Sequence, residues 1–144
     1  MIEQDTIRLL RECDAGIKMG VSSIEDVIDD VSNEDFKATL EKSISEHQRL
    51  QDDIQILLDQ YHDDGKDPNP MAKGMSFIKT NFKMAVDKSD NTIADLMTDG
   101  CNMGVKSLAK YLNEYKAADE KSKNLAKKVI KIEEDLASDI QVYL

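Results

Sequence analysis

The sequence predicts an all-α protein, an up-down-up-down four-helix bundle that forms one domain over residues 1–144. Apolar residues recur three and four positions apart through most of the chain, which is the spacing of amphipathic helices. No segment of useful length alternates apolar and polar residues, so strands are not expected. Short first and third connections and a longer middle one join the helical segments, as in helix bundles.

The first hairpin is expected to contain a helix over residues 4–31 and a second helix over residues 36–61. Ser32, in the turn VSNEDF, suits the N-cap of the second helix because its hydroxyl can accept a backbone hydrogen bond. The second helix is expected to end in HDDGKDPNP, where Gly65 and two prolines oppose continuation. The apolar stripes comprise Ile7, Leu10, Cys13, Ile17, Val21, Ile24, Ile28, Val31, Phe36, Leu40, Leu50, Ile54, Leu57 and Tyr61.

The third element is predicted to be interrupted. A short amphipathic piece over residues 71–86 is followed by the sequence DKSDN, which breaks the pattern near residues 88–91. A long helix over residues 93–115 follows, and after a turn in KAADEK the last helix covers residues 125–143.

Composition and charge favour a cytoplasmic protein. The chain carries 19 basic and 29 acidic side chains, a net charge of −10, and such a surface repels nucleic acid and anionic lipid. No apolar run approaches the roughly 18 residues of a membrane span, and the N-terminus lacks the features of a signal peptide. We therefore expect neither nucleic acid nor membrane as a partner. Cys13 and Cys101 are expected to be reduced thiols that pack as small apolar side chains.

Two similar segments place glycines in the middle of expected helices. MGVSSI at residues 19–24 matches MGVKSL at residues 103–108, and the same register pairs Gly16 with Gly100 and Gly20 with Gly104. A weaker similarity relates LQDDI at residues 50–54 to LASDI at residues 136–140. These similarities predict that the chain consists of two helical hairpins in tandem. Because each interior glycine costs about 1 kcal/mol relative to alanine, the four glycines need an explanation.

These features resemble the ferritin-like superfamily, and more narrowly a bacterial ferritin-like family that carries an acidic residue beside a G-x-x-G type segment. The matching segments here are DAGIKMG at residues 14–20 and DGCNMG at residues 99–104. The resemblance covers nearly the whole chain. It implies a ferritin-like bundle, and it leaves the biochemical role open.

The di-iron ligand set that the resemblance would imply is incomplete. Di-iron members carry a Glu on helices 1 and 3 and a Glu-x-x-His pair on helices 2 and 4. Here Ile44 stands three residues before His47, and the last helix has no histidine. Glu12 and Glu46 lie beside the apolar stripes and are expected to be solvated. We therefore expect no catalytic residues and no intact di-iron oxidase site.

His47 takes an apolar position in the stripe of the second helix, and antiparallel pairing places it level with Gly16 and Gly20. The same counting places Glu133 level with Gly100 and Gly104. We hypothesise that the glycines make room opposite a polar layer in which His47 and Glu133 meet directly or share a water or an ion. The alternatives are a buried neutral His47 with its own hydrogen bonds, and glycines that only permit close packing.

The most economical function is a non-enzymatic ferritin-like binding or interaction module. We expect this module to form a homodimer, and the sequence does not identify any other protein partner. The alternative is a metal-binding or redox-related protein with a degenerate site around His47, in which His47 and Glu133 would bind one ion of iron, manganese or zinc. No other cofactor is expected.

Overall fold

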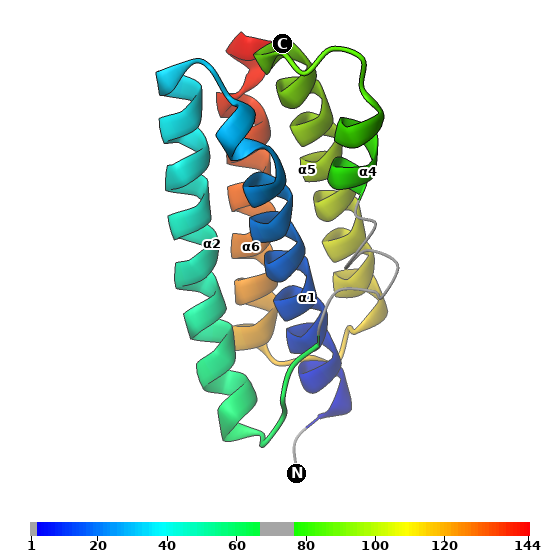
Figure 1. Cartoon of the computed structure of the whole chain (residues 1–144). Helices are drawn as coiled ribbons and strands as arrows, with labels where there is room; N and C mark the ends of the chain where they lie inside the picture. Colours follow the sequence, from blue (N-terminus) through cyan, green and yellow to red (C-terminus); the bar gives the residue numbers. More distant parts are fainter. Residues whose placement is uncertain (1–2, 67–76) are drawn as a thin grey trace.

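Helices make up the architecture of the computed structural model, which describes residues 3–66 and 77–144. Within these residues five α-helices pack together and no strand is present, which confirms the all-α prediction (Figure 1). The helices are α1 (Gln4–Val27), α2 (Glu34–Gln60), α4 (Phe77–Met84), α5 (Asp90–Glu114) and α6 (Glu120–Asp139). Single 3₁₀ turns follow α1 (η1, Ile28–Asp30) and α6 (η2, Gln141–Tyr143).

Contacts at the helix ends fix the directions of the four long helices. The backbone N–H groups of Ser32 and Asn33, between α1 and α2, each donate to the Asp90 carboxylate at 2.8 Å. α5 therefore begins at the end of the molecule where α2 begins, and it runs parallel to α2 (Figure 1). At the opposite end, the N–H of Asp119 donates to the Thr6 hydroxyl at 2.9 Å, so α6 begins beside the start of α1.

The predicted up-down-up-down order is therefore wrong, and the order is up-down-down-up. The reason is the middle connection, which does not turn back at the end of α2. The start of α5 lies at the opposite end of the molecule from the end of α2, whose 27 residues span about 40 Å, and α4 lies against α1 and α5. The consequence is a ring in which α1, α2, α6 and α5 each contact antiparallel neighbours.

The helix ends follow local capping chemistry. The N-cap of α2 is Asn33 rather than the predicted Ser32, because the Asn33 side chain accepts from the N–H of Phe36 at 2.9 Å. α1 ends at Val27, earlier than predicted. The predicted break in the third element is confirmed, since α4 ends at Met84 and Ser89 caps α5. The start of that element, residues 71–76, lies outside the described residues.

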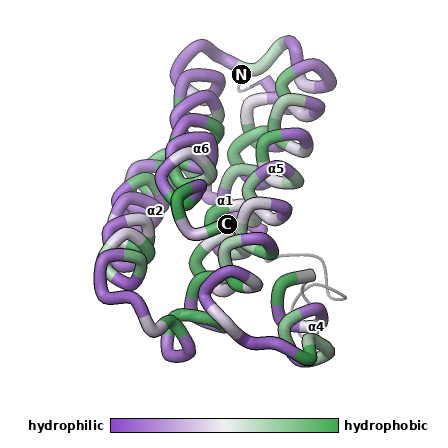
Figure 2. The backbone as a smooth tube through the Cα atoms, turned by 90° about the horizontal axis from the view of Figure 1, so that it is seen from above, coloured by the Kyte–Doolittle hydropathy of each residue, from purple (hydrophilic) through white to green (hydrophobic). Residues whose placement is uncertain are grey.

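Two apolar clusters fill the interior. One lies toward the start of α1 and the end of α2, and includes Leu9, Ile17, Ile54 and Val129. The other lies toward the opposite end and includes Ile24, Phe36, Met97, Cys101 and Leu136. Seen along the helices, apolar positions turn inward and polar positions outward (Figure 2).

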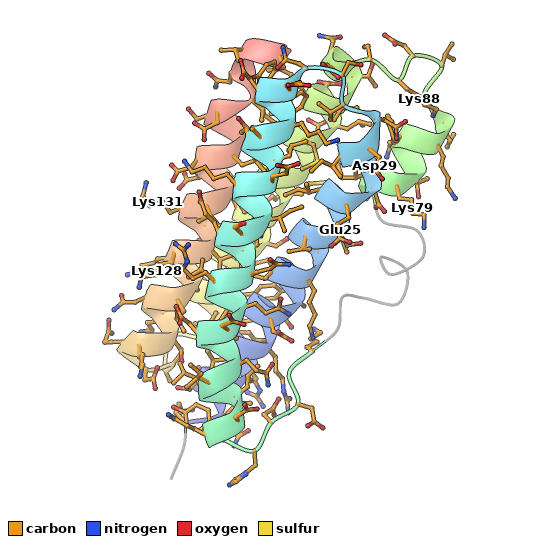
Figure 3. All side chains as sticks on the ribbon, turned by 60° about the vertical axis from the view of Figure 1, so that its left-hand side comes forward. Glu25, Asp29, Lys79, Lys88, Lys128 and Lys131 are labelled. Carbon is orange, nitrogen blue, oxygen red and sulfur yellow. The ribbon has the colours of Figure 1, made fainter. Side chains whose placement is uncertain are left out.

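The exterior is strongly charged. Lys128 and Lys131 extend away from α6, while Glu25 of α1 and Asp29 of η1 lie on the side of the molecule that carries α4 (Figure 3). Among the helices that the structure describes, none is long and apolar enough to cross a membrane.

We expect Asp90→Ala to lower the free energy of unfolding by about 2 kcal/mol, because the carboxylate accepts two backbone N–H groups across the chain. Urea denaturation would measure the loss. Asp95→Ala, at an exposed position of the same helix, is the matched control. Equal stability of the two variants would contradict the assigned direction of α5.

Candidate functional site

His47 and Glu133 meet inside the molecule. His47 lies on α2 and Glu133 on α6, and they are 0% and 8% exposed. The Nε2 atom of His47 contacts Oε1 of Glu133 in a hydrogen-bonded ion pair. The predicted polar layer is therefore confirmed for these two side chains, and it lies between the two apolar clusters.

The hydrogen bonds of His47 orient its ring. Nδ1 donates to the backbone carbonyl of Ser43 at 2.7 Å, one turn earlier on α2, and this leaves Nε2 for Glu133. Burial lowers the pKa of His47, but the hydrogen bond and charge of Glu133, the Ser43 carbonyl and the charge of Glu46 together outweigh it. The pKa of His47 is therefore raised above its ordinary value, which favours an imidazolium paired with a carboxylate.

The four glycines have different surroundings. A Cβ atom on Gly20 would lie 2.6 Å from Nε2 of His47, so this glycine makes room for the ion pair. A Cβ on Gly104 would lie 3.5 Å from Oε2 of Glu133, an ordinary contact. A Cβ on Gly100 would lie 3.1 Å from Cδ1 of Ile78, whereas a Cβ on Gly16 would meet nothing within 4 Å. The expected role of making room for the ion pair therefore applies to Gly20, whereas Gly104 lies beside Glu133 but has room for a methyl group.

All four glycines line one cavity of about 460 Å³ between α1 and α5, which we call the glycine pocket. Glu133 reaches it from α6, and its side chain is the part of the ion pair that faces the cavity. Most of the other walls are apolar, and they include Met19, Ile24, Ile78, Met97, Met103 and Leu108. The cavity thus combines an apolar wall with one buried charged group.

The far end of the glycine pocket holds a second ion pair. Nζ of Lys66 donates to Oε1 of Glu12 at 2.5 Å. Burial and the neighbouring Glu12 carboxylate raise the pKa of Tyr111, which lines the same end of the pocket. The expectation that Glu12 is solvated is wrong, because its side chain is only 13% exposed. The sequence held a signal for this placement: Glu12, Gly16 and Gly20 are four apart and share one helix face. Glu46, on α2, is half-buried.

A buried carboxylate holds Lys66 in place. Asp14 is 0% exposed, and its Oδ2 accepts from Nζ of Lys18 at 2.8 Å and from the N–H of Lys66 at 3.0 Å. Gly65 precedes this contact with φ +81°, a left-handed conformation that suits glycine, and a Cβ there would lie 2.5 Å from Oδ2 of Asp14. Asp14 therefore fixes the chain that delivers Lys66 to the pocket.

The cysteines are buried and reduced, as predicted. Cys101 lines the glycine pocket, and its thiol lies near the Glu133 carboxylate. Burial, with the nearby Glu133 charge, raises the pKa of Cys101 well above its ordinary range. Burial raises the pKa of Cys13 to about 12. Both thiols are therefore protonated at neutral pH and are poor nucleophiles.

The predicted metal ligands, His47 and Glu133, come together, but as a pair. In the described part of the chain, no group of three or more His, Cys, Asp or Glu side chains is placed to hold a metal ion. In the present arrangement Nδ1 of His47 is committed to Ser43, and Nε2 is committed to Glu133. A metal at this pair would have to replace the direct contact.

Alanine substitutions should separate the roles of the glycines. Gly16→Ala and Gly104→Ala should each raise the free energy of unfolding by up to about 1 kcal/mol, because alanine favours the helix and neither Cβ clashes. Gly20→Ala should lower it by about 1–2 kcal/mol, because its Cβ would displace the His47 ring. Chemical denaturation of the three variants measures their free energies of unfolding and shows which substitutions stabilise the protein. Stabilisation by Gly20→Ala would contradict this arrangement of the ion pair.

The ion pair should also make stability depend on pH. Because the pKa of His47 is higher in the folded protein, its contribution is complete below the ordinary histidine pKa and is lost as pH rises through the folded value. Urea unfolding between about pH 6 and pH 9 should show this decline. Glu133→Gln should remove the decline and cost roughly 3 kcal/mol at low pH. The control is Glu134→Gln, at the exposed neighbouring position, and an unchanged decline in Glu133→Gln would contradict the assignment.

Comparison with known proteins identifies no relative of this chain. No family model matches it, and neither the curated proteins nor the solved structures include a significant match. The geometry of the glycine pocket and of its ion pair is therefore the basis for assigning a function.

Proposed function

We propose that this chain is a non-enzymatic, ferritin-like binding module that takes up a small, largely apolar molecule in the glycine pocket. One observation carries the proposal: a cavity of about 460 Å³ with mostly apolar walls is joined by a buried, charged side chain, Glu133. Ligand sites in proteins commonly have volumes of roughly 300–1,000 Å³, apolar walls and a few polar groups that orient the ligand.

The glycines support a binding role over a packing role. Gly16 and Gly104 have room for a methyl group, so close approach of neighbouring atoms does not require glycine there. Each still costs about 1 kcal/mol of helix stability relative to alanine. An open cavity accounts for this cost, because larger side chains at these positions would occupy it.

The relation to ferritin-like proteins has structural support of its own. Four long helices form two hairpins joined by a long connection, and His47 and Glu133 lie at mid-height on α2 and α6. Gly20 and Gly104 face them from α1 and α5, the helices on which a di-iron member would carry carboxylates. This arrangement corresponds to a ligand layer whose metal ligands have been replaced by an ion pair and a cavity.

The alternative function, binding of iron, manganese or zinc at His47 and Glu133, has one supporting observation, their direct contact inside the molecule. Elemental analysis of protein purified without a polyhistidine tag separates the two functions. Near-stoichiometric metal, lost in a His47→Gln variant, would favour the metal site over the pocket.

A homodimer remains part of this proposal. Met84, the last residue of α4, and Val86 are 76% and 104% exposed, and apolar side chains left on a surface can contact a second copy.

A larger side chain that points into the glycine pocket should weaken ligand binding. An environment-sensitive apolar dye should bind the native protein and raise its Tm, because a ligand of the folded state stabilises it. Gly16→Leu should lower dye affinity at least about tenfold, since its side chain enters space where a Cβ meets nothing within 4 Å. Ala109→Leu, at an exposed position of α5, adds the same side chain outside the pocket and should leave affinity unchanged. Equal binding by both variants would contradict the proposal.

A further inference from the structure

We propose that the ligand of the glycine pocket is an aliphatic amine, bound with its ammonium group at Glu133 and its hydrocarbon chain between α1 and α5. This inference rests on the proposed function and adds the chemistry of the head group. It follows from the hydrogen-bonding capacity of Glu133 and from the charges around the cavity.

Glu133 has acceptor capacity left over. An ionised carboxylate offers about four acceptor positions on its two oxygens. Oε1 accepts from His47, and the Cys101 thiol lies nearby. Oε2 lies 3.5 Å from the place where a Cβ of Gly104 would stand, and Gly104 lines the cavity. A ligand that reaches Glu133 therefore meets an acceptor and satisfies it best with donor groups.

The position of His47 prevents it from offering the ligand an alternative partner. The ring is 0% exposed, and Nδ1 is held by the Ser43 carbonyl. The imidazolium therefore stays behind Glu133, and the carboxylate separates it from a ligand in the cavity. The Glu133 carboxylate therefore lies between the His47 imidazolium and the ammonium group of the ligand. Each cation contacts the carboxylate, and the two cations do not contact each other.

An anionic head group would meet unfavourable surroundings. Glu12 and Glu133 both line the cavity, and Lys66 is the basic residue among its described lining residues. Lys66 is already paired with Glu12 at the far end, where Asp14 holds its backbone. The whole chain also carries a net charge of −10, so its long-range field attracts cations.

The apolar part of the cavity suits a hydrocarbon chain. Met19, Met97 and Met103 supply side chains that adapt to the shape of an alkyl group. The glycines leave helix backbone rather than side chains along the wall, so a narrow, unbranched chain can lie against α1 and α5. A primary alkylamine combines this chain with three N–H donors at one end.

The test compares octylamine, octanol and octanoate, which share one chain and differ in head group. Binding to the native protein at neutral pH is followed through the amide resonances of the glycines that line the cavity, in protein labelled with nitrogen-15. We expect octylamine to bind about tenfold more tightly than octanol, and octanoate to bind most weakly. The Glu133→Gln variant should lose the preference for amine over alcohol, and the matched Glu134→Gln variant should keep it.

The outcomes distinguish the two proposals. If none of the three compounds shifts the glycine resonances, the proposed function fails. If all three bind with equal affinity, or if octanoate binds best, the glycine pocket is a binding site but the proposal of an amine ligand is wrong. Circular dichroism shows whether Glu133→Gln is folded. Should it not fold, the order of the three compounds on the native protein still decides for or against the amine.

Discussion

The ion pair between His47 and Glu133 is the constraint around which the interior is arranged. Two charged groups removed from water are costly unless they contact each other and their remaining hydrogen bonds are made. Here the pair joins α2 to α6, and Ser43 satisfies the other ring nitrogen. A shift of either helix by one turn would separate the charges, so the pair fixes the register of the two hairpins. The apolar clusters on either side of it are held in that register.

The ion pair also determines which residues can face it. A methyl group at position 20 would collide with the imidazole, which explains one glycine by sterics alone. The explanation does not extend to Gly16, whose missing side chain leaves open space. The same residue type thus has two different roles, four positions apart on one helix. One role allows a neighbour to approach, and the other keeps space unfilled.

Much of this arrangement follows from local sequence rules, and the errors have identifiable causes. The spacing of apolar residues predicted the helices, and counting residues back from each turn predicted that His47 and Glu133 would meet. This worked because each hairpin turn is short, so the positions on its two helices can be counted from the turn. The direction of α5 could not be obtained in that way, since it depends on where a long connection ends, and Asp90 decides it through contacts with residues nearly sixty positions away. Glu12 was misjudged for a related reason: its partner, Lys66, belongs to that connection.

The two hairpins meet along a surface that contains both the ion pair and the glycine pocket. Contacts within a hairpin join residues close in sequence, whereas α1 meets α5, and α2 meets α6, only after the long connection has been closed. On the α1–α5 side, glycines on both helices leave space between the apolar side chains, and the glycine pocket occupies that space. The two walls of that space belong to different hairpins, because α1 lies in the first hairpin and α5 in the second. The size of the cavity is therefore set by how the two hairpins pack against each other, and not by the structure of either hairpin alone.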